Sequence, residues 1–269
     1  VEPEPETAAL DQAIRSGALA ASPPTATDLT HSLLPMADVS LPFSQSPRLP
    51  ITESPPPPFV AREQELAHLE QWLALALQGK GRVAFVVGEP GSGKTALLHE
   101  FARRAMQQHP DLVVAGGSGK AYTGLGDPYL PFVEILQRLT GDTDPRQAGG
   151  TLTPEAARRL RALFPLAMQV LVEQGPELLD TLLPGADLLR RAQALAPVRA
   201  PWRARLNDLV QASAALRGYP GLPQGALLGR CARVLCALAS AHPLLLLLDD
   251  LQWADASSVS LLFHLGRTL

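Results

Sequence analysis

The chain has 269 residues, of which 46% are hydrophobic and 18% charged, enough for one large or two small domains. Its formal net charge of −3 gives no global attraction to nucleic acid or to an anionic membrane. The longest apolar run, residues 243–248, is far too short to span a bilayer, and the acidic, proline-containing first residues are unlike a signal peptide. Cys231 and Cys236 lack metal-ligand spacing, so we expect buried free thiols, which fits a cytoplasmic protein.

The first 58 residues predict a short helical segment and a linker. Within residues 1–20, Thr7 is a suitable N-cap and Gly17 a suitable end for a short helix. Such a helix is unstable alone, so we expect residues 1–20 to be the tail of a preceding domain. Residues 21–58 are rich in proline and end in four consecutive prolines, which predicts a disordered linker with partial polyproline II character.

Order is expected to resume at residue 59. Residues 59–78 predict an amphipathic helix, because leucines recur at helical spacing at positions 66, 69, 73 and 77. Residues 82–87 form a short apolar, β-branched run, which is typical of a buried strand.

Residues 88–95 read G-x-x-x-x-G-K-T and lie between that strand and a helical pattern at residues 96–106. Strand, glycine loop and helix is the P-loop arrangement. Glycines let the backbone curl around a phosphate chain, and the following helix adds unpaired N–H groups and the positive end of its dipole. The alternative, an ordinary glycine turn, is disfavoured by the flanking strand and helix.

The P-loop pattern assigns a role to each residue type. We expect Lys94 to reach the β- and γ-phosphates as a catalytic residue, and the Thr95 hydroxyl to ligate Mg²⁺. The predicted phosphate-binding residues are Gly88, Pro90, Gly91, Ser92, Gly93, Lys94, Thr95 and Ala96.

A second strand is predicted at residues 111–116. Residues 116–120 have the composition of another phosphate loop, but the glycine spacing fails, so we interpret them as a flexible strand exit. A helix is expected to follow and to end at Leu139. Residues 141–240 then predict a helical insertion, in which Thr153 caps a helix that starts at Pro154.

Prolines within that insertion are expected to cut it into short helices, at positions 165, 176, 184, 197 and 201, before one longer helix at residues 224–240. Its arginines between Leu188 and Asn207 have no acidic neighbour in sequence. We expect a solvated or partner-facing surface there, with phosphate sensing or a nucleic-acid contact as alternatives.

Residues 243–248 are fully apolar and precede Asp249 and Asp250, a pattern that favours a central parallel strand with two carboxylates at its end. Because Mg²⁺ on a triphosphate prefers oxygen ligands and keeps several waters, we expect Asp249 to hold Mg²⁺ through water. Asp250 is the candidate base that polarises the attacking water. The two acids could instead cap a turn or helix. Asp255 is a suitable N-cap for a helix at residues 256–265, and Trp253 is interpreted as a packing wedge.

Four stretches resemble known families. Residues 59–66 (F-V-A-R-E-Q-E-L) resemble the F-V-G-R-E-x-E-L opening of STAND-class and related AAA-type ATPases, with Ala61 in place of the glycine. There the segment lies over the adenine, which implies that Val60 and Arg62 contact the nucleotide. Residues 128–132 are similar to the P-Y-x-P-F segment, and residues 249–255 to the D-D-x-x-W-A-D signature, of STAND ATPases. Residues 1–15 resemble the end of the bacterial transcriptional activation domain found in SARP-type regulators.

The resemblance implies an α/β fold, a P-loop NTPase three-layer sandwich with a parallel sheet, over residues 59–269, with the helical insertion at about 141–240. P-loop ATPases of this type place one further strand between the P-loop strand and the acidic strand, after the last helix seen here. We therefore expect a C-terminally truncated core, in which two apolar strands lack their shared neighbour and hydrolysis is weak.

The sequence as a whole predicts an ATP- and Mg²⁺-binding signalling ATPase, a nucleotide-dependent switch in a cytoplasmic bacterial transcriptional regulator. Its expected partners are nucleotide, other domains of the same polypeptide and further copies when ATP is bound, with DNA contacted only by a domain outside this chain and no membrane. The alternatives are the same module attached to a nucleotide cyclase or kinase, a P-loop kinase acting on a small molecule, and a nucleotide-binding scaffold without hydrolysis.

Overall fold

A computed structural model describes residues 62–120, 128–143, 153–197, 199–215 and 223–269. The predicted helical tail at residues 1–20, the proline-rich linker at 21–58 and the predicted nucleotide contact Val60 lie outside these described residues.

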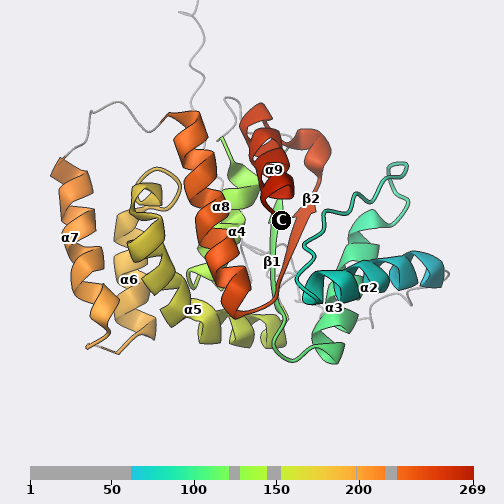
Figure 1. Ribbon diagram of the computed structural model, residues 1–269, viewed down its shortest axis with the longest axis horizontal. Helices are drawn as coiled ribbons and strands as arrows, with labels where there is room; N and C mark the ends of the chain where they lie inside the picture. Colours follow the sequence, from blue (N-terminus) through green and yellow to red (C-terminus); the bar gives the residue numbers. More distant parts are fainter. Residues whose placement is uncertain (1–61, 121–127, 144–152, 198, 216–222) are drawn as a thin grey trace, which may run out of the picture. The chain divides into compact units, whose positions relative to one another are not determined.

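A two-stranded parallel sheet forms the centre of the described fold (Figure 1). Strand β1 (Val113–Ser118) pairs with β2 (Leu244–Asp249), in a register that runs from Val113 opposite Leu244 to Ser118 opposite Asp249. Side chains alternate along both strands. Leu244, Leu246 and Leu248 contact one apolar cluster, while Leu245 and Leu247 contact a second cluster on the other face. A run of leucines therefore serves a strand that is covered on both faces, as predicted.

Helices cover both faces of the sheet. On one face lie α2 (Glu63–Leu77) and α3 (Lys94–Gln108), which share a cluster with Leu245 and Leu247. The other face carries α4 (Leu130–Leu139), α5 (Pro154–Gln174), α8 (Gln224–Ala241) and α9 (Ala256–Thr268). The remaining elements are η1 (Pro176–Leu178), α6 (Gly185–Leu195), α7 (Pro201–Ala215) and η2 (Leu251–Trp253). The result is the mixed α/β architecture, with a parallel sheet, that the sequence predicts.

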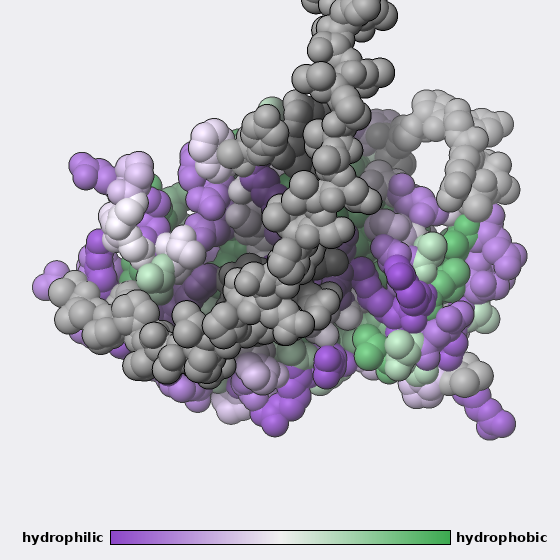
Figure 2. Space-filling view, turned by 180° about the vertical axis from the view of Figure 1, so that it is seen from behind, coloured by the Kyte–Doolittle hydropathy of each residue, from purple (hydrophilic) through white to green (hydrophobic). Residues whose placement is uncertain are grey.

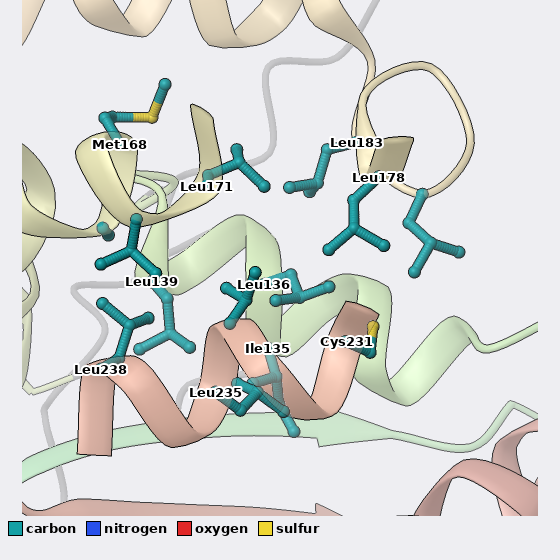
Figure 3. Packing of buried hydrophobic residues seen from close by; sticks show 14 of the residues in the cluster. Ile135, Leu136, Leu139, Met168, Leu171, Leu178, Leu183, Cys231, Leu235 and Leu238 are labelled. Carbon is teal, nitrogen blue, oxygen red and sulfur yellow. The ribbon is translucent and has the colours of Figure 1, made fainter. Parts of the chain in front are cut away.

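The larger core lies between α4, α5 and α8 (Figure 3). Ile135, Leu136 and Leu139 of α4 meet Leu235 and Leu238 of α8, and α5 closes the cluster from above with Met168 and Leu171. Phe164 and Trp202 pack edge to face, with ring centroids 5.8 Å apart and planes at 85°. This packing joins α5 to α7.

Both cysteines are free thiols, as predicted, but only Cys231 is fully buried. Burial raises the pKa of its thiol to about 12, which keeps it protonated and inert. Cys236 is partly exposed, because it lies on another side of α8. The prediction of two buried thiols is therefore correct for one residue.

The strand predicted at residues 82–87 does not form. These residues have no strand neighbour among those described, because β2 pairs with β1 on one edge and no described strand runs along its other edge. Without a ladder the segment has no regular secondary structure, and Val83, Phe85 and Val87 are exposed, Val87 to 90%. The prediction of a buried strand at residues 82–87 is therefore wrong, because a strand needs hydrogen-bonded partners as well as an apolar pattern.

Pro165 does not end a helix, contrary to the prediction, because α5 continues through it. A proline inside a helix costs roughly 3 kcal/mol. Here it lies in a helix whose neighbours Phe164, Ala167 and Met168 are buried in the larger core, and this packing outweighs the lost hydrogen bond. The other prolines behave as expected, since Pro176 and Pro201 each begin a helical segment.

No described helix has both the length and the apolar composition needed to cross a membrane. On the face seen in Figure 2, hydrophilic side chains make up much of the coloured surface, and apolar side chains lie in small groups between them.

Candidate functional site

The glycine loop at residues 88–93 leads directly into α3. Gly91 and Gly93 have φ angles of 78° and 81°, a left-handed conformation that favours glycine, and open space surrounds both α-carbons. Gly93 is the N-cap of α3 and supplies no side-chain acceptor. The first N–H groups of α3 therefore point out of the helix without a cap. Their free donors make this end of the helix suitable for binding an anion.

Lys94 folds back over this loop. Its Nζ donates hydrogen bonds to the carbonyl oxygens of Gly88, at 3.0 Å, and Glu89, at 2.9 Å. Ser92 closes the turn by donating from its backbone N–H to the Glu89 carbonyl at 3.2 Å. The ammonium thus lies at the same loop as the uncapped N–H groups, and Thr95 is exposed on the first turn of α3.

Arg62 joins the start of α2 to the glycine loop. Its Nη2 donates to the Ser92 carbonyl at 2.6 Å, and its Nη1 donates to Glu65 at 2.9 Å. Arg62 therefore contacts the glycine loop, and its observed partner there is the loop backbone.

Ion pairs hold α2 against α3. Arg104 donates to both oxygens of Glu63, at 2.9 and 3.1 Å, and to Glu100 at 2.8 Å. Arg103 donates to the same Glu100 through two nitrogens. The helix that begins with Lys94 is thereby tied to the segment that carries Arg62.

Glu100 predicts a pH dependence of stability. Hydrogen bonds from Arg103 lower its pKa most, burial raises it and Arg104 lowers it further, so the pKa falls from 4.5 to about 2. A carboxylate with a depressed folded-state pKa stabilises the fold above its unfolded pKa and loses this contribution as the pH falls through the folded pKa. We expect Glu100→Gln to lower the free energy of unfolding by about 1 kcal/mol at neutral pH, and by progressively less as the pH falls from about 4.5 to 2.

Urea denaturation at neutral and acidic pH measures this difference. Glu70→Gln is the matched control, because Glu70 also lies on this pair of helices and makes no ion pair with a described residue. A difference for Glu100→Gln that stays the same across the pH range would contradict the assignment.

The predicted acids lie at the end of β2. Asp249 is opposite Ser118 in the sheet, and its Oδ1 accepts a hydrogen bond from the Asp250 backbone N–H at 2.9 Å. Asp250 has a φ of 51°, which is unusual for a non-glycine residue, and its Oδ1 accepts from Gln252 at 2.8 Å. Although Asp250 precedes η2, its side chain does not cap that helix. Capping therefore does not account for Asp250.

Asp255 is the N-cap of α9, as predicted. Its Oδ1 accepts from the N–H groups of Ser257 and Ser258, at 2.8 and 3.0 Å, and its Oδ2 accepts from the Tyr129 N–H at 3.1 Å. Burial raises the pKa of this carboxyl, but the hydrogen bonds from Ser258, Tyr129 and Ser257 outweigh that effect, and the net pKa is lowered. Trp253, by contrast, is 55% exposed, so its interpretation as a packing wedge is wrong.

No helix starts within residues 116–120. The prediction of a flexible strand exit is also wrong, since β1 includes Gly116, Gly117 and Ser118. Glu134 of α4 accepts hydrogen bonds from the Ser118 N–H at 3.0 Å and from Lys120 at 2.6 Å. The sequence pattern gave no signal for Glu134, which appears there only as one acid on an amphipathic helix.

Arg159 of α5 closes the other end of α3, a role that the sequence did not reveal. Its guanidinium donates to the carbonyl oxygens of Met106 and His109, both at 2.8 Å, and of Leu112, at 2.9 Å. Glu155 orients it through a further hydrogen bond at 2.8 Å. The helical insertion thus contacts the helix that carries Lys94.

The candidate site consists of an uncapped helix start with a lysine on its glycine loop, and of two consecutive acids at the end of β2, the strand on which that helix packs. Within the described ranges, no group of three or more His, Cys, Asp or Glu side chains could hold a metal ion by itself. The predicted metal ligands lie on separate elements, Thr95 on α3 and Asp249 on β2. Such an arrangement defines a P-loop nucleotide-binding ATPase domain.

Comparison with known proteins agrees with this class. The family described as "AAA ATPase domain" matches residues 58–269, and the chain therefore belongs to the AAA ATPase domain family. Origin recognition complex subunit 1 of Rattus norvegicus is 35% identical over 83 residues, which cover 30% of this chain and 10% of that protein. The chain thus matches only about a tenth of the length of this curated relative. No solved structure matches.

Proposed function

We propose that this chain is the ATP- and Mg²⁺-binding module of a signalling ATPase, which switches a bacterial transcriptional regulator between two states. The observation that carries the proposal is the uncapped start of α3 behind Gly91 and Gly93, with the Lys94 ammonium on the same loop. Among the described residues no acidic side chain accepts a hydrogen bond from these donors, and a phosphate chain supplies the oxygens that they need.

In this proposal the phosphates bind across the loop, to N–H groups of residues 88–96. Lys94 exchanges its two carbonyl partners for β- and γ-phosphate oxygens, because a charged acceptor forms the stronger bond. Arg62 stays on the Ser92 carbonyl and holds the loop, while Val60, in the preceding residues, contacts the adenine.

Thr95 and Asp249 are the residues that would hold Mg²⁺, Thr95 directly and Asp249 through water. When bound, Mg²⁺ neutralises charge on the β- and γ-phosphates. Asp250 is the proposed base toward the attacking water, and its exposure leaves the carboxylate accessible. Gln252, which donates to Asp250, orients that carboxylate without removing its charge.

The switch role rests on the likeness of residues 59–66 and 249–255 to STAND ATPases and of residues 1–15 to a bacterial activation domain. The proposed hydrolysis is slow, so that the bound γ-phosphate sets the lifetime of the active state. Further copies of the chain are the proposed partners of that state. The name of the matched relative, a subunit of a complex, agrees with assembly as a function of such domains. DNA is contacted by another domain, and the compartment is the cytoplasm.

The experiment is nucleotide binding to the full chain, followed with a fluorescent ATP analogue with and without Mg²⁺. We expect Lys94→Ala to weaken binding at least tenfold, because a charge-assisted bond to phosphate is lost. Asp249→Asn is expected to keep binding without Mg²⁺ and to lose the gain that Mg²⁺ brings. Lys80→Ala, an exposed lysine outside the loop, is the matched control.

Equal binding by the wild type, Lys94→Ala and Lys80→Ala would overturn the proposal. Tight Mg²⁺-dependent binding without phosphate release, measured over hours, would favour the nucleotide-binding scaffold instead.

A further inference from the structure

The turn that carries the two acids presses against the end of β1. The Gly119 N–H donates to the Asp249 carbonyl at 3.0 Å, one residue beyond the last pair of the sheet. A Cβ at Gly119 would collide with the Asp250 carbonyl oxygen and would lie 3.1 Å from the Ala254 nitrogen and 3.2 Å from the Trp253 carbonyl carbon. All three atoms belong to the backbone, so no side-chain rotation could relieve the contact.

Space, and not backbone conformation, requires glycine at this position. The φ angle of Gly119 lies outside the left-handed region that Gly91 and Gly93 occupy. An alanine at position 119 would therefore have no strain in its own backbone and would act only by displacing neighbouring atoms.

The turn at residues 250–254 cannot move away from Gly119 one atom at a time, because its backbone atoms are hydrogen-bonded to one another. The Asp250 carbonyl that faces Gly119 already accepts the Trp253 N–H at 2.9 Å, and the Leu251 carbonyl accepts the Ala254 N–H at 3.0 Å. Asp250 itself holds a left-handed conformation that costs about 1–2 kcal/mol for a non-glycine residue. A side chain at position 119 must therefore move the turn as a unit, and Asp249 and Asp250 with it.

A second contact holds the same turn from α4. Asp255 uses one oxygen to cap α9 and the other to accept the Tyr129 N–H at the start of α4. The start of α4 is itself seated on β1, because a Cβ at Gly117 would collide with the Pro131 carbonyl. The end of β1, the start of α4 and the turn after β2 thus fix one another.

We propose that Gly119 and Asp255 are positioning residues, which set where the carboxylates of Asp249 and Asp250 lie relative to the glycine loop. The inference rests on the proposed function, since it assigns these residues to the placement of the acids that act on Mg²⁺ and water. In the proposed mode of binding neither residue contacts the nucleotide. Their effect on the reaction comes from geometry, because a misplacement of about 1 Å can cost roughly a hundredfold in rate.

Gly119→Ala in the full chain tests this inference. We expect hydrogen exchange of residues 249–255 to rise about tenfold, because the turn loses its contact with β1. Nucleotide affinity without Mg²⁺ should stay within about twofold of the wild type, since the phosphate-binding loop is a separate element. The gain in affinity on adding Mg²⁺, and hydrolysis where it is measurable, should fall about tenfold or more.

Gly229→Ala is the matched control, because Gly229 lies within α8 and nothing approaches a Cβ there within 4 Å. It should leave exchange at residues 249–255 and the response to Mg²⁺ unchanged.

Asp255→Asn keeps the test decisive where Gly119→Ala fails to fold. The asparagine oxygen still caps α9, but its NH₂ group can accept neither the Tyr129 N–H nor the Ser258 hydroxyl, so the link to α4 is cut and one contact in the first turn of α9 is lost. We expect hydrogen exchange of residues 249–255 to rise about threefold and the gain in affinity on adding Mg²⁺ to fall about threefold. The exchange pattern of helices α5 and α8 should be unchanged.

Two failures are distinguishable. If the wild type gains affinity with Mg²⁺ and both variants gain as much, the positioning inference is wrong and the proposed function stands. If the wild type and Lys94→Ala both fail to bind nucleotide, the proposed function is wrong and the inference falls with it, whatever the exchange at residues 249–255 shows.

Discussion

Replacing Arg159 with alanine is expected to lower the free energy of unfolding by about 3 kcal/mol, since hydrogen bonds from a charged donor contribute roughly 1.5–3 kcal/mol and several are lost together. The Arg159 side chain is only 13% exposed, and it donates hydrogen bonds to three backbone carbonyls, those of Met106, His109 and Leu112. Truncation leaves these acceptors at the end of α3 without their donor. Arg159→Lys should recover little of the loss, because one ammonium cannot reproduce the planar fork.

Arg158→Ala is the control for this experiment. Arg158 is adjacent in sequence and also pairs with Glu155, but its side chain is 77% exposed. Its loss should change stability by no more than about 0.5 kcal/mol. Urea denaturation followed by circular dichroism measures both variants. Equal losses would mean that pairing with Glu155, and not the closure of α3, is what Arg159 contributes.

Replacing Phe164 with alanine is expected to lower the free energy of unfolding by about 3–5 kcal/mol, the usual cost of emptying an aromatic site in a core. Phe164 is fully buried, packs edge to face on Trp202, and lies so close to Gly141 that a Cβ there would be 2.7 Å from its ring. Trp202 of α7 and the loop at Gly141 therefore lose contacts together, and a well-packed site of this kind collapses poorly.

Phe263→Ala removes the same number of atoms from α9, where the side chain is 64% exposed, and should change stability by less than about 0.5 kcal/mol. Thermal unfolding by calorimetry compares the two. A large loss for Phe263→Ala would show that this exposed ring is covered in solution.

Local physics made much of the fold predictable. The leucine stripe of α2 is buried at Leu66, Leu69 and Leu73, and Thr153 and Asp255 cap the helices expected of them. The leucine run of β2 was correctly assigned to a parallel strand. The stripe, the caps and the unbroken apolar run are patterns of neighbouring residues, so a period or a capping residue is enough to find them, although β2 pairs with a strand far away in sequence.

Features that depend on distant partners were not predictable. Residues 82–87 have the composition of a strand, but whether a strand forms is decided by a hydrogen-bonded neighbour elsewhere in the chain. Pro165 remains helical because of core packing that no local pattern shows. Arg159 reaches carbonyls about 50 residues earlier, and nothing in its own surroundings indicates them.

The candidate site likewise has features that local sequence patterns predict and features that depend on distant contacts. The spacing of residues 88–95 predicted a glycine loop before a helix, and the apolar run predicted a strand that ends in two acids, and the structure has both elements. Spacing also excluded residues 116–120 as a phosphate loop, but it could not explain their glycines. The reason is a close approach between the end of β1 and a turn far away in sequence, which only the structure reveals.

The parallel pairing of β1 with β2 has a consequence for how the chain folds. Val113 meets Leu244 only after the chain has passed through α4 to α8, so closing the sheet brings together the ends of a very long loop. Local helices form first and quickly, whereas contacts between residues so far apart in sequence form late and slowly. We therefore expect Asp249 to take its place opposite Ser118 near the end of folding, after the helices between the two strands have formed.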